Sequence, residues 1–159
     1  MPDSETPSSA TDRARCLVVL DTQVVLDWLV FRDLSTAALA SALESESLHW
    51  LTTQAMQDEL EHVLDRGVAA ALRPDRAAIA RTLDRLALRV EPRVPTGPPL
   101  RCSDPDDQMF IDLALAVGAQ WLFTRDRALL RLARRARERG VTVLRPADWK
   151  LSALPATAR

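Results

Sequence analysis

Several residue types are scarce in this chain, and each scarcity excludes a class of protein. The only two cysteines, Cys16 and Cys102, have none of the paired spacing of a zinc site or a disulfide framework. Tyrosine is absent and aromatic residues make up 4% of the chain, which leaves little surface for stacking on nucleic-acid bases. No apolar run approaches the roughly 18 residues of a membrane span. We therefore expect a cytoplasmic protein with free thiols and no contact with a membrane.

The length and composition of the chain fit one domain. Domains usually contain about 100–200 residues, and 47% hydrophobic against 27% charged residues is ordinary for a globular protein. Residues 1–15 are polar and contain no apolar segment, so we expect a disordered leader there rather than a secretion signal. No periodic pattern follows Trp149, and residues 151–159 are expected to form a flexible tail.

The basic charge is almost entirely arginine and is unevenly distributed. One lysine and twenty arginines are present, and seven of these arginines lie between Arg125 and Arg139. A formal net charge of −1 therefore does not exclude a nucleic-acid partner. Residues 126–139 have an apolar side and an arginine side, which fits either a phosphate-binding surface or an ordinary solvated helix.

Short apolar runs alternate with segments of helical periodicity along the whole chain. Strands are expected at 16–20, 48–52, 88–94, 120–124 and 141–144, and helices at 22–31, 35–45, 53–65, 74–88, 106–117 and 126–139. Right-handed crossovers between such elements build an α/β fold with a mostly parallel central sheet flanked by helices. In open sheets of this kind, sites form beyond the carboxyl ends of the strands.

Four acidic residues are candidates for such a site. Asp21 and Asp126 each follow an expected strand, Asp107 begins an expected helix, and Glu59 lies within another. Carboxylates are the ligands that Mg²⁺ and Mn²⁺ prefer, and these ions activate water for displacement at phosphorus. Each residue also has an ordinary structural explanation, because aspartate is favoured at helix N-caps and in first turns. Spacing alone leaves both interpretations open.

The segments around these residues resemble the PIN-domain family, in particular its bacterial branch of toxins from toxin-antitoxin pairs. The resemblance covers about Cys16–Lys150. It rests on the segments VVLDTQVV at 18–25, MQDELEHVL at 56–64, DPDDQMFIDLALAVGA at 104–119 and WLFTRDRALL at 121–130. It implies that residues 16–150 form a PIN-like nuclease domain, a three-layer sandwich with helices on both faces of the sheet.

The resemblance also implies a site and an activity. Its metal ligands and catalytic residues would be Asp21, Glu59, Asp107 and Asp126. They would hold Mg²⁺ or Mn²⁺ and cleave single-stranded RNA. Expected supporting residues beside these ligands are Gln23, Thr124 and Asp104, and expected RNA contacts are Arg125, Arg127, Arg134 and Arg135. Expected partners are RNA, a small antitoxin protein and a second copy of the chain in a homodimer.

One position departs from the family pattern. The family usually has asparagine, which is thought to orient the acids, where this chain has Gln23, and the added methylene moves the amide by more than about 1 Å. A PIN-like module that binds RNA or protein without cutting is therefore an alternative. A phosphohydrolase of the haloacid dehalogenase type is a weaker one, because it needs a second aspartate where Gln23 stands. Asp104 or Asp106 would replace Asp107 if the register differs.

Overall fold

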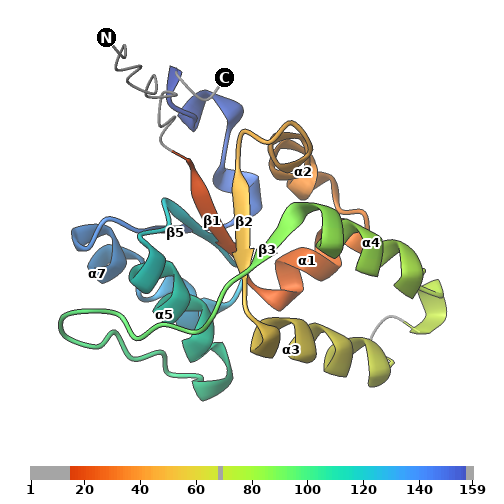
Figure 1. The fold of residues 1–159 in the computed structure, drawn as a ribbon, viewed down its shortest axis with the longest axis horizontal. Helices are drawn as coiled ribbons and strands as arrows, with labels where there is room; N and C mark the ends of the chain where they lie inside the picture. The colour runs from red at the N-terminus through yellow and green to blue at the C-terminus, as the bar shows by residue number, and fades with distance from the viewer. Residues whose placement is uncertain (1–14, 68–69, 157–159) are drawn as a thin grey trace, which may run out of the picture.

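Five parallel strands form the central sheet of the computed structural model, which describes residues 15–67 and 70–156 (Figure 1). The strand order is β3-β2-β1-β4-β5, and every neighbouring pair is parallel. The bounds are β1 (Leu17–Leu20), β2 (His49–Thr52), β3 (Ala87–Arg89), β4 (Trp121–Phe123) and β5 (Thr142–Leu144). The predicted α/β architecture is confirmed. Apart from Arg15, the expected leader at 1–15 lies outside the described residues.

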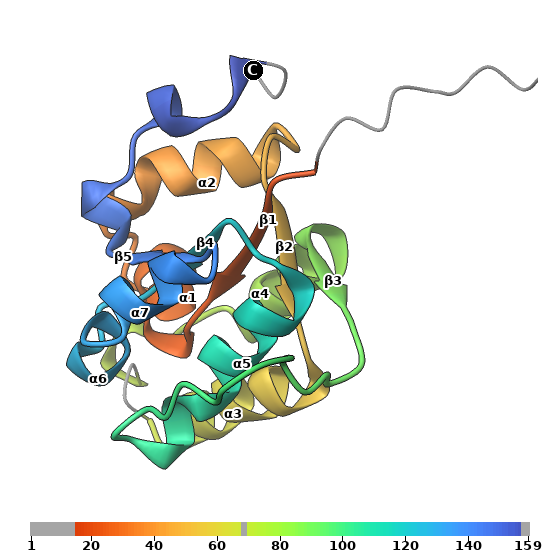
Figure 2. The same ribbon diagram turned by 90° about the vertical axis from the view of Figure 1, so that its left-hand side faces the viewer.

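Helices cover both faces of this sheet, giving three layers (Figures 1 and 2). One face packs against α1 (Thr22–Leu29), α2 (Ala37–Glu44) and α4 (Arg76–Leu86). The other packs against α5 (Gln108–Val117), α6 (Arg127–Leu130) and α7 (Ala133–Glu138). The remaining helix, α3 (Gln54–Asp65), contributes to both apolar clusters. Among the described residues, none of the helices combines the length and apolar character that crossing a membrane requires.

The central strand β1 shows why its sequence is a continuous apolar run. Val18 and Leu20 point into the cluster under α1 and α2, whereas Val19 points into the cluster under α5. Side chains alternate between the two faces of a strand, and here both faces are buried. Both valines are fully buried, so the strand tolerates no polar residue until it ends at Asp21.

The basic segment predicted as one helix at 126–139 is two helices in the structure. Arg131 ends α6, and α7 begins after Leu132. The backbone N–H of Leu132 donates to the carbonyl of Leu129 at 2.9 Å, a 3₁₀-type bond that tightens this turn. Both leucines are buried, so the tighter turn keeps the apolar side of the segment against the sheet.

Two further segments differ from expectation. Pro74 does not open α4, because Asp75 is the N-cap and its carboxylate accepts a hydrogen bond from the N–H of Ala78 at 3.0 Å. The tail expected to be flexible after Lys150 contains a 3₁₀ helix at Leu151–Ala153, and Leu154 packs into the core. One buried leucine is enough to hold this segment against the domain, although residues 157–159 lie outside the described part.

Replacing Leu122 by alanine should lower the free energy of unfolding by about 2–5 kcal/mol, because this side chain is fully buried in β4, an inner strand of the sheet. The matched control is Leu88→Ala on the edge strand β3, where the side chain is 57% exposed. That change should cost less than about 1 kcal/mol. Urea denaturation of both variants measures the difference, and equal losses would contradict the packing described above.

Candidate functional site

The site begins where β1 and β4 lie side by side. Leu20 and Phe123 are paired in the sheet, so the residues that follow them, Asp21 and Thr124, emerge together at the carboxyl edge. The backbone N–H of Asp21 donates to the carbonyl of Phe123 at 3.1 Å. The chain turns to β2 on one side of β1, whereas β4 pairs on the other, which makes this edge a topological switch point.

Thr124 links the two aspartates that follow these strands. Its hydroxyl donates to Oδ2 of Asp21 and accepts a hydrogen bond from the backbone N–H of Asp126 at 2.9 Å. Both the Asp21 and Thr124 side chains are almost entirely buried. The threonine therefore fixes the position of the Asp21 carboxylate and of the Asp126 backbone.

The same aspartates also cap helices, as their positions before helical segments predicted. Oδ1 of Asp21 accepts a hydrogen bond from the N–H of Val24 at 2.8 Å at the start of α1. Oδ1 of Asp126 accepts from the N–H groups of Ala128 and Leu129 at the start of α6, at 2.7 and 3.3 Å. Capping uses one oxygen of each carboxylate, so the structural role and a role in ligand binding are compatible.

Asp107 joins these aspartates from the other side of the site. It ends the 3₁₀ helix η3 (Pro105–Asp107), which Asp104 caps by accepting a hydrogen bond from the N–H of Asp106 at 3.0 Å. Burial, followed by the charges of Asp126 and Asp104, raises the pKa of Asp107 to about 7. The charge of Asp21 contributes in the same direction. The fold thus brings Asp21, Asp107 and Asp126 within mutual electrostatic reach.

The pKa of Asp21 is raised as well. Its burial raises its pKa to about 6, although the hydroxyl of Thr124 and the N–H of Val24 act in the opposite direction, and the charge of Asp126 raises it further. Carboxylates that approach each other without a cation hold protons more tightly than usual. Perturbed acids at the crevice of an open sheet are a recognised mark of a functional site.

The structure places Glu59 differently from the three aspartates. It lies half-buried on α3 and lines a groove together with Asp58, His62 and Arg66 on that helix and Asp106 and Met109 across from it. This groove runs between α3 and the segment that carries Asp107. Glu59 therefore faces the same side of the molecule as the aspartates without being one of the groups that set the pKa values of Asp21 and Asp107.

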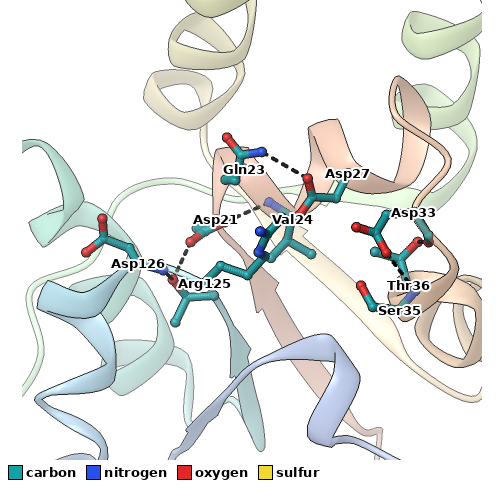
Figure 3. A network of polar contacts seen from close by, with 10 residues as sticks. Asp21, Gln23, Val24, Asp27, Asp33, Ser35, Thr36, Arg125 and Asp126 are labelled. Carbon is teal, nitrogen blue, oxygen red and sulfur yellow. Dashed lines mark hydrogen bonds and ion pairs between the residues drawn. The ribbon is translucent and has the colours of Figure 1, made fainter.

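A buried aspartate that the sequence reasoning did not single out lies next to the site. Asp27, on α1, is 2% exposed. Its Oδ2 forms an ion pair with Nη1 of Arg125 at 2.6 Å, and its Oδ1 accepts a hydrogen bond from Nε2 of Gln23 at 2.9 Å (Figure 3). The sequence signal that could have identified it is an acidic residue between Leu26 and Trp28, the only charged residue on this helix.

The four arginines expected to contact RNA fall into two groups. Arg125 is engaged in the ion pair with Asp27, although its side chain remains 49% exposed. Arg127, Arg134 and Arg135 are exposed at the start of α6 and along α7. Arg134 is 92% exposed and lies 3.9 Å from Glu138, a spacing at which a surface ion pair contributes little.

The donor set suits a hard divalent cation. Within residues 15–67 and 70–156, no group of three His, Cys, Asp or Glu side chains is placed so that it could hold a metal ion. Mg²⁺ can bind with fewer protein ligands, because it keeps several waters and binds through one or two carboxylates. The carboxylates that would hold it, one or two of them directly, are those of Asp21, Asp107 and Asp126, whose mutual repulsion a cation would relieve.

Replacing Asp21 by asparagine should stabilise the protein at pH 8 in EDTA. The pKa of Asp21 is higher in the folded than in the unfolded state. Ionisation of Asp21 therefore destabilises the fold, and the free energy of unfolding falls as the pH rises from about 4 to 6. Removing this buried charge should return roughly 1–3 kcal/mol, and asparagine also serves as an N-cap. Urea denaturation measures the gain, which should shrink toward pH 4. A variant less stable than the parent at pH 8 would contradict the burial argument.

Comparison with known proteins agrees with the fold. A family model described as PIN domain matches residues 17–128, which is more than half of the chain and includes Asp21, Glu59, Asp107 and Asp126. A search of the curated proteins finds no significant match. PIN domains are generally nucleases that use divalent metal ions. From the parallel sheet, the acidic residues at its carboxyl edge and the family match, we conclude that the chain belongs to the PIN domain family.

Proposed function

We propose that this PIN domain is an endoribonuclease that hydrolyses single-stranded RNA with Mg²⁺ or Mn²⁺. One observation carries the proposal: Asp21, Asp107 and Asp126 gather at the carboxyl edge of β1 and β4, and the pKa values of two of them are raised to about 6 and about 7. Such a cluster is costly for the fold, and a bound cation supplies the charge that offsets it.

The ion and the residues around it would have different roles in the reaction. When bound, the divalent ion supplies a Lewis acid that activates water and stabilises charge at the phosphorus. Thr124 holds the Asp21 carboxylate in place through its hydroxyl. Burial and the neighbouring charges of Asp126 and Asp104 raise the pKa of Asp107 to about 7, so a proton would compete with a cation for this carboxylate near neutral pH. Each ligand must be ionised to bind, so the apparent affinity for the metal rises with pH over this range.

Glu59 is proposed as a further ligand or water-positioning group. It lines the groove between α3 and the Asp107 segment, so a substrate or hydrated ion lying in that groove would contact it through water. Glu59→Gln should therefore reduce cleavage less than Asp21→Asn does.

The exposed arginines of α6 and α7 are proposed to contact the RNA backbone. Arg127 follows Asp126 directly, and Arg134 and Arg135 follow on α7, so the segment that leaves the acidic site carries positive charge that would offset its repulsion of a polyanion. Guanidinium groups bind phosphate with two parallel hydrogen bonds. In this arrangement the carboxylates act on the scissile phosphate through the metal, and the arginines hold neighbouring phosphates.

The toxin role rests on the resemblance to bacterial PIN toxins. We propose that a small antitoxin protein inhibits the domain and that the domain forms a homodimer. Co-expression with the product of a short adjoining reading frame, followed by co-purification, tests the pairing. Sedimentation equilibrium tests the dimer.

A non-catalytic binding module is the second candidate, and a specific contact favours it. The amide of Gln23, which stands where the family usually has asparagine, donates to Asp27 at 2.9 Å. An amide committed to Asp27 contributes less to orienting the acids. Binding of RNA without metal-dependent cutting would identify this second function.

Asp21→Asn and Asp126→Asn should each abolish cleavage of a mixed-sequence single-stranded RNA in Mn²⁺ or Mg²⁺. Each substitution removes a metal-binding charge while keeping the side-chain volume and the helix cap. The measurement compares gel-resolved products from the parent, both variants and an EDTA control. The matched control is Asp84→Asn, which changes an exposed aspartate on α4 and should cut as the parent does. Equal cutting by all proteins would indicate a contaminating nuclease.

Replacing Arg134 and Arg135 by alanine should weaken RNA binding more at low salt than at high salt. Each lost phosphate contact should reduce the slope of log K against log salt concentration by about 0.7 for a single strand. Fluorescence anisotropy with a labelled RNA in EDTA measures this without cleavage. Arg81→Ala, on exposed surface of α4, is the control. An unchanged slope would return α7 to the role of an ordinary solvated helix.

A further inference from the structure

The turn that follows β4 is attached to α1 at two separate points. At the first, Asp21 accepts a hydrogen bond from the Thr124 hydroxyl. At the second, the Arg125 side chain reaches along α1 to Asp27, with Nη1 2.6 Å from Oδ2. On its other side the turn is held to β5, where the N–H of Thr124 donates to the carbonyl of Leu144 at 2.9 Å, so the Arg125–Asp27 contact adds a side-chain attachment to α1.

The second attachment is built from a buried charge. The Asp27 side chain is 3% exposed, and Arg125 is the cation that pairs with it. Leaving such a carboxylate without its partner is costly, so the fold strongly favours the conformation in which Arg125 reaches it. Arg125 lies between Thr124, which the sheet holds through its N–H to Leu144, and Asp126, so the ion pair restricts the part of the turn that leads to Asp126.

Gln23 completes this arrangement. Its amide donates to the other oxygen of Asp27 from one helical turn away, a spacing at which glutamine and aspartate side chains meet on a helix. Asparagine, shorter by one methylene, would not span this distance to Asp27. The glutamine thus holds the carboxylate that in turn holds Arg125 (Figure 3).

We infer that Asp27 is a positioning residue for the carboxylate site. By holding the Arg125 side chain, it fixes the 124–126 turn against α1 and so sets the placement of the Asp126 carboxylate relative to that of Asp21. Gln23 supports Asp27 in this role. The consequence for metal binding rests on the proposed function, whereas the consequence for the turn does not.

The first measurement needs neither metal nor RNA. Amide hydrogen exchange of Asp126, whose N–H donates to the Thr124 hydroxyl, reports the order of the turn. In EDTA, Asp27→Asn and Arg125→Gln should each speed this exchange by about 10-fold or more, while the Leu20 amide in the sheet keeps the parent rate. Gln23→Ala and Gln23→Asn should act in the same direction with smaller effect, and Arg125→Lys should restore part of the protection.

The second measurement separates positioning from direct contact with RNA. Positioning predicts that Asp27→Asn and Arg125→Gln each weaken Mn²⁺ binding about 10–100-fold, measured by electron paramagnetic resonance of the free ion. Both should lower kcat with KM unchanged, and the double variant should be no worse than either single one, because both remove the same attachment. The control is Arg85→Gln, which breaks the exposed pair with Glu44 between α4 and α2 and should leave all readouts unchanged.

The outcomes are distinct. Unchanged Asp126 exchange in both variants would overturn the inference, as would a raised KM in Arg125→Gln with no effect of Asp27→Asn, which is the result expected for a direct phosphate contact. Faster exchange in a protein whose parent neither binds Mn²⁺ nor cuts RNA would sustain the positioning role and defeat the proposed nuclease.

Discussion

The parallel pairing of β1 with β4 brings the site together. Asp21 and Asp126 are far apart in the chain, yet the register that pairs Leu20 with Phe123 delivers them to one edge of the sheet. The pairing is held by apolar side chains buried on both faces of each strand. Since a shift of one residue would turn these side chains to the wrong faces, the burial of the core also determines the register. The geometry of the site is therefore a product of hydrophobic packing.

The acidic cluster sets two requirements against each other. Folding favours separated, solvated carboxylates, whereas a hard cation is held best by carboxylates that converge. The structure reconciles them partly through helix ends. Asp21 and Asp126 each place one oxygen on the N–H groups at the start of a helix, where the helix dipole favours negative charge. The remaining repulsion appears as the raised pKa values of Asp21 and Asp107.

The side chain at position 23 contacts a residue on its own helix. In this chain Gln23 contacts Asp27, and Asp27 pairs with Arg125 from the turn that carries the site. Arg125 therefore forms an ion pair within the protein, although its position beside the acidic residues is one at which an RNA-binding arginine is expected. The exposed arginines of α7, by contrast, have few competing partners, and their charge is directed to solvent.

Local patterns were sufficient to predict the elements. The apolar runs and the helical periodicity identified all five strands and the segments that form the helices, because these depend on neighbours close in sequence. Asp27 and the break within 126–139 were not predictable in this way. The partner of Asp27 lies far along the chain, and the break depends on how Leu129 and Leu132 meet the sheet. Long-range pairing and packing are set by the folded chain as a whole, so the tertiary structure alone decided which carboxylates converge and which arginine is held among them.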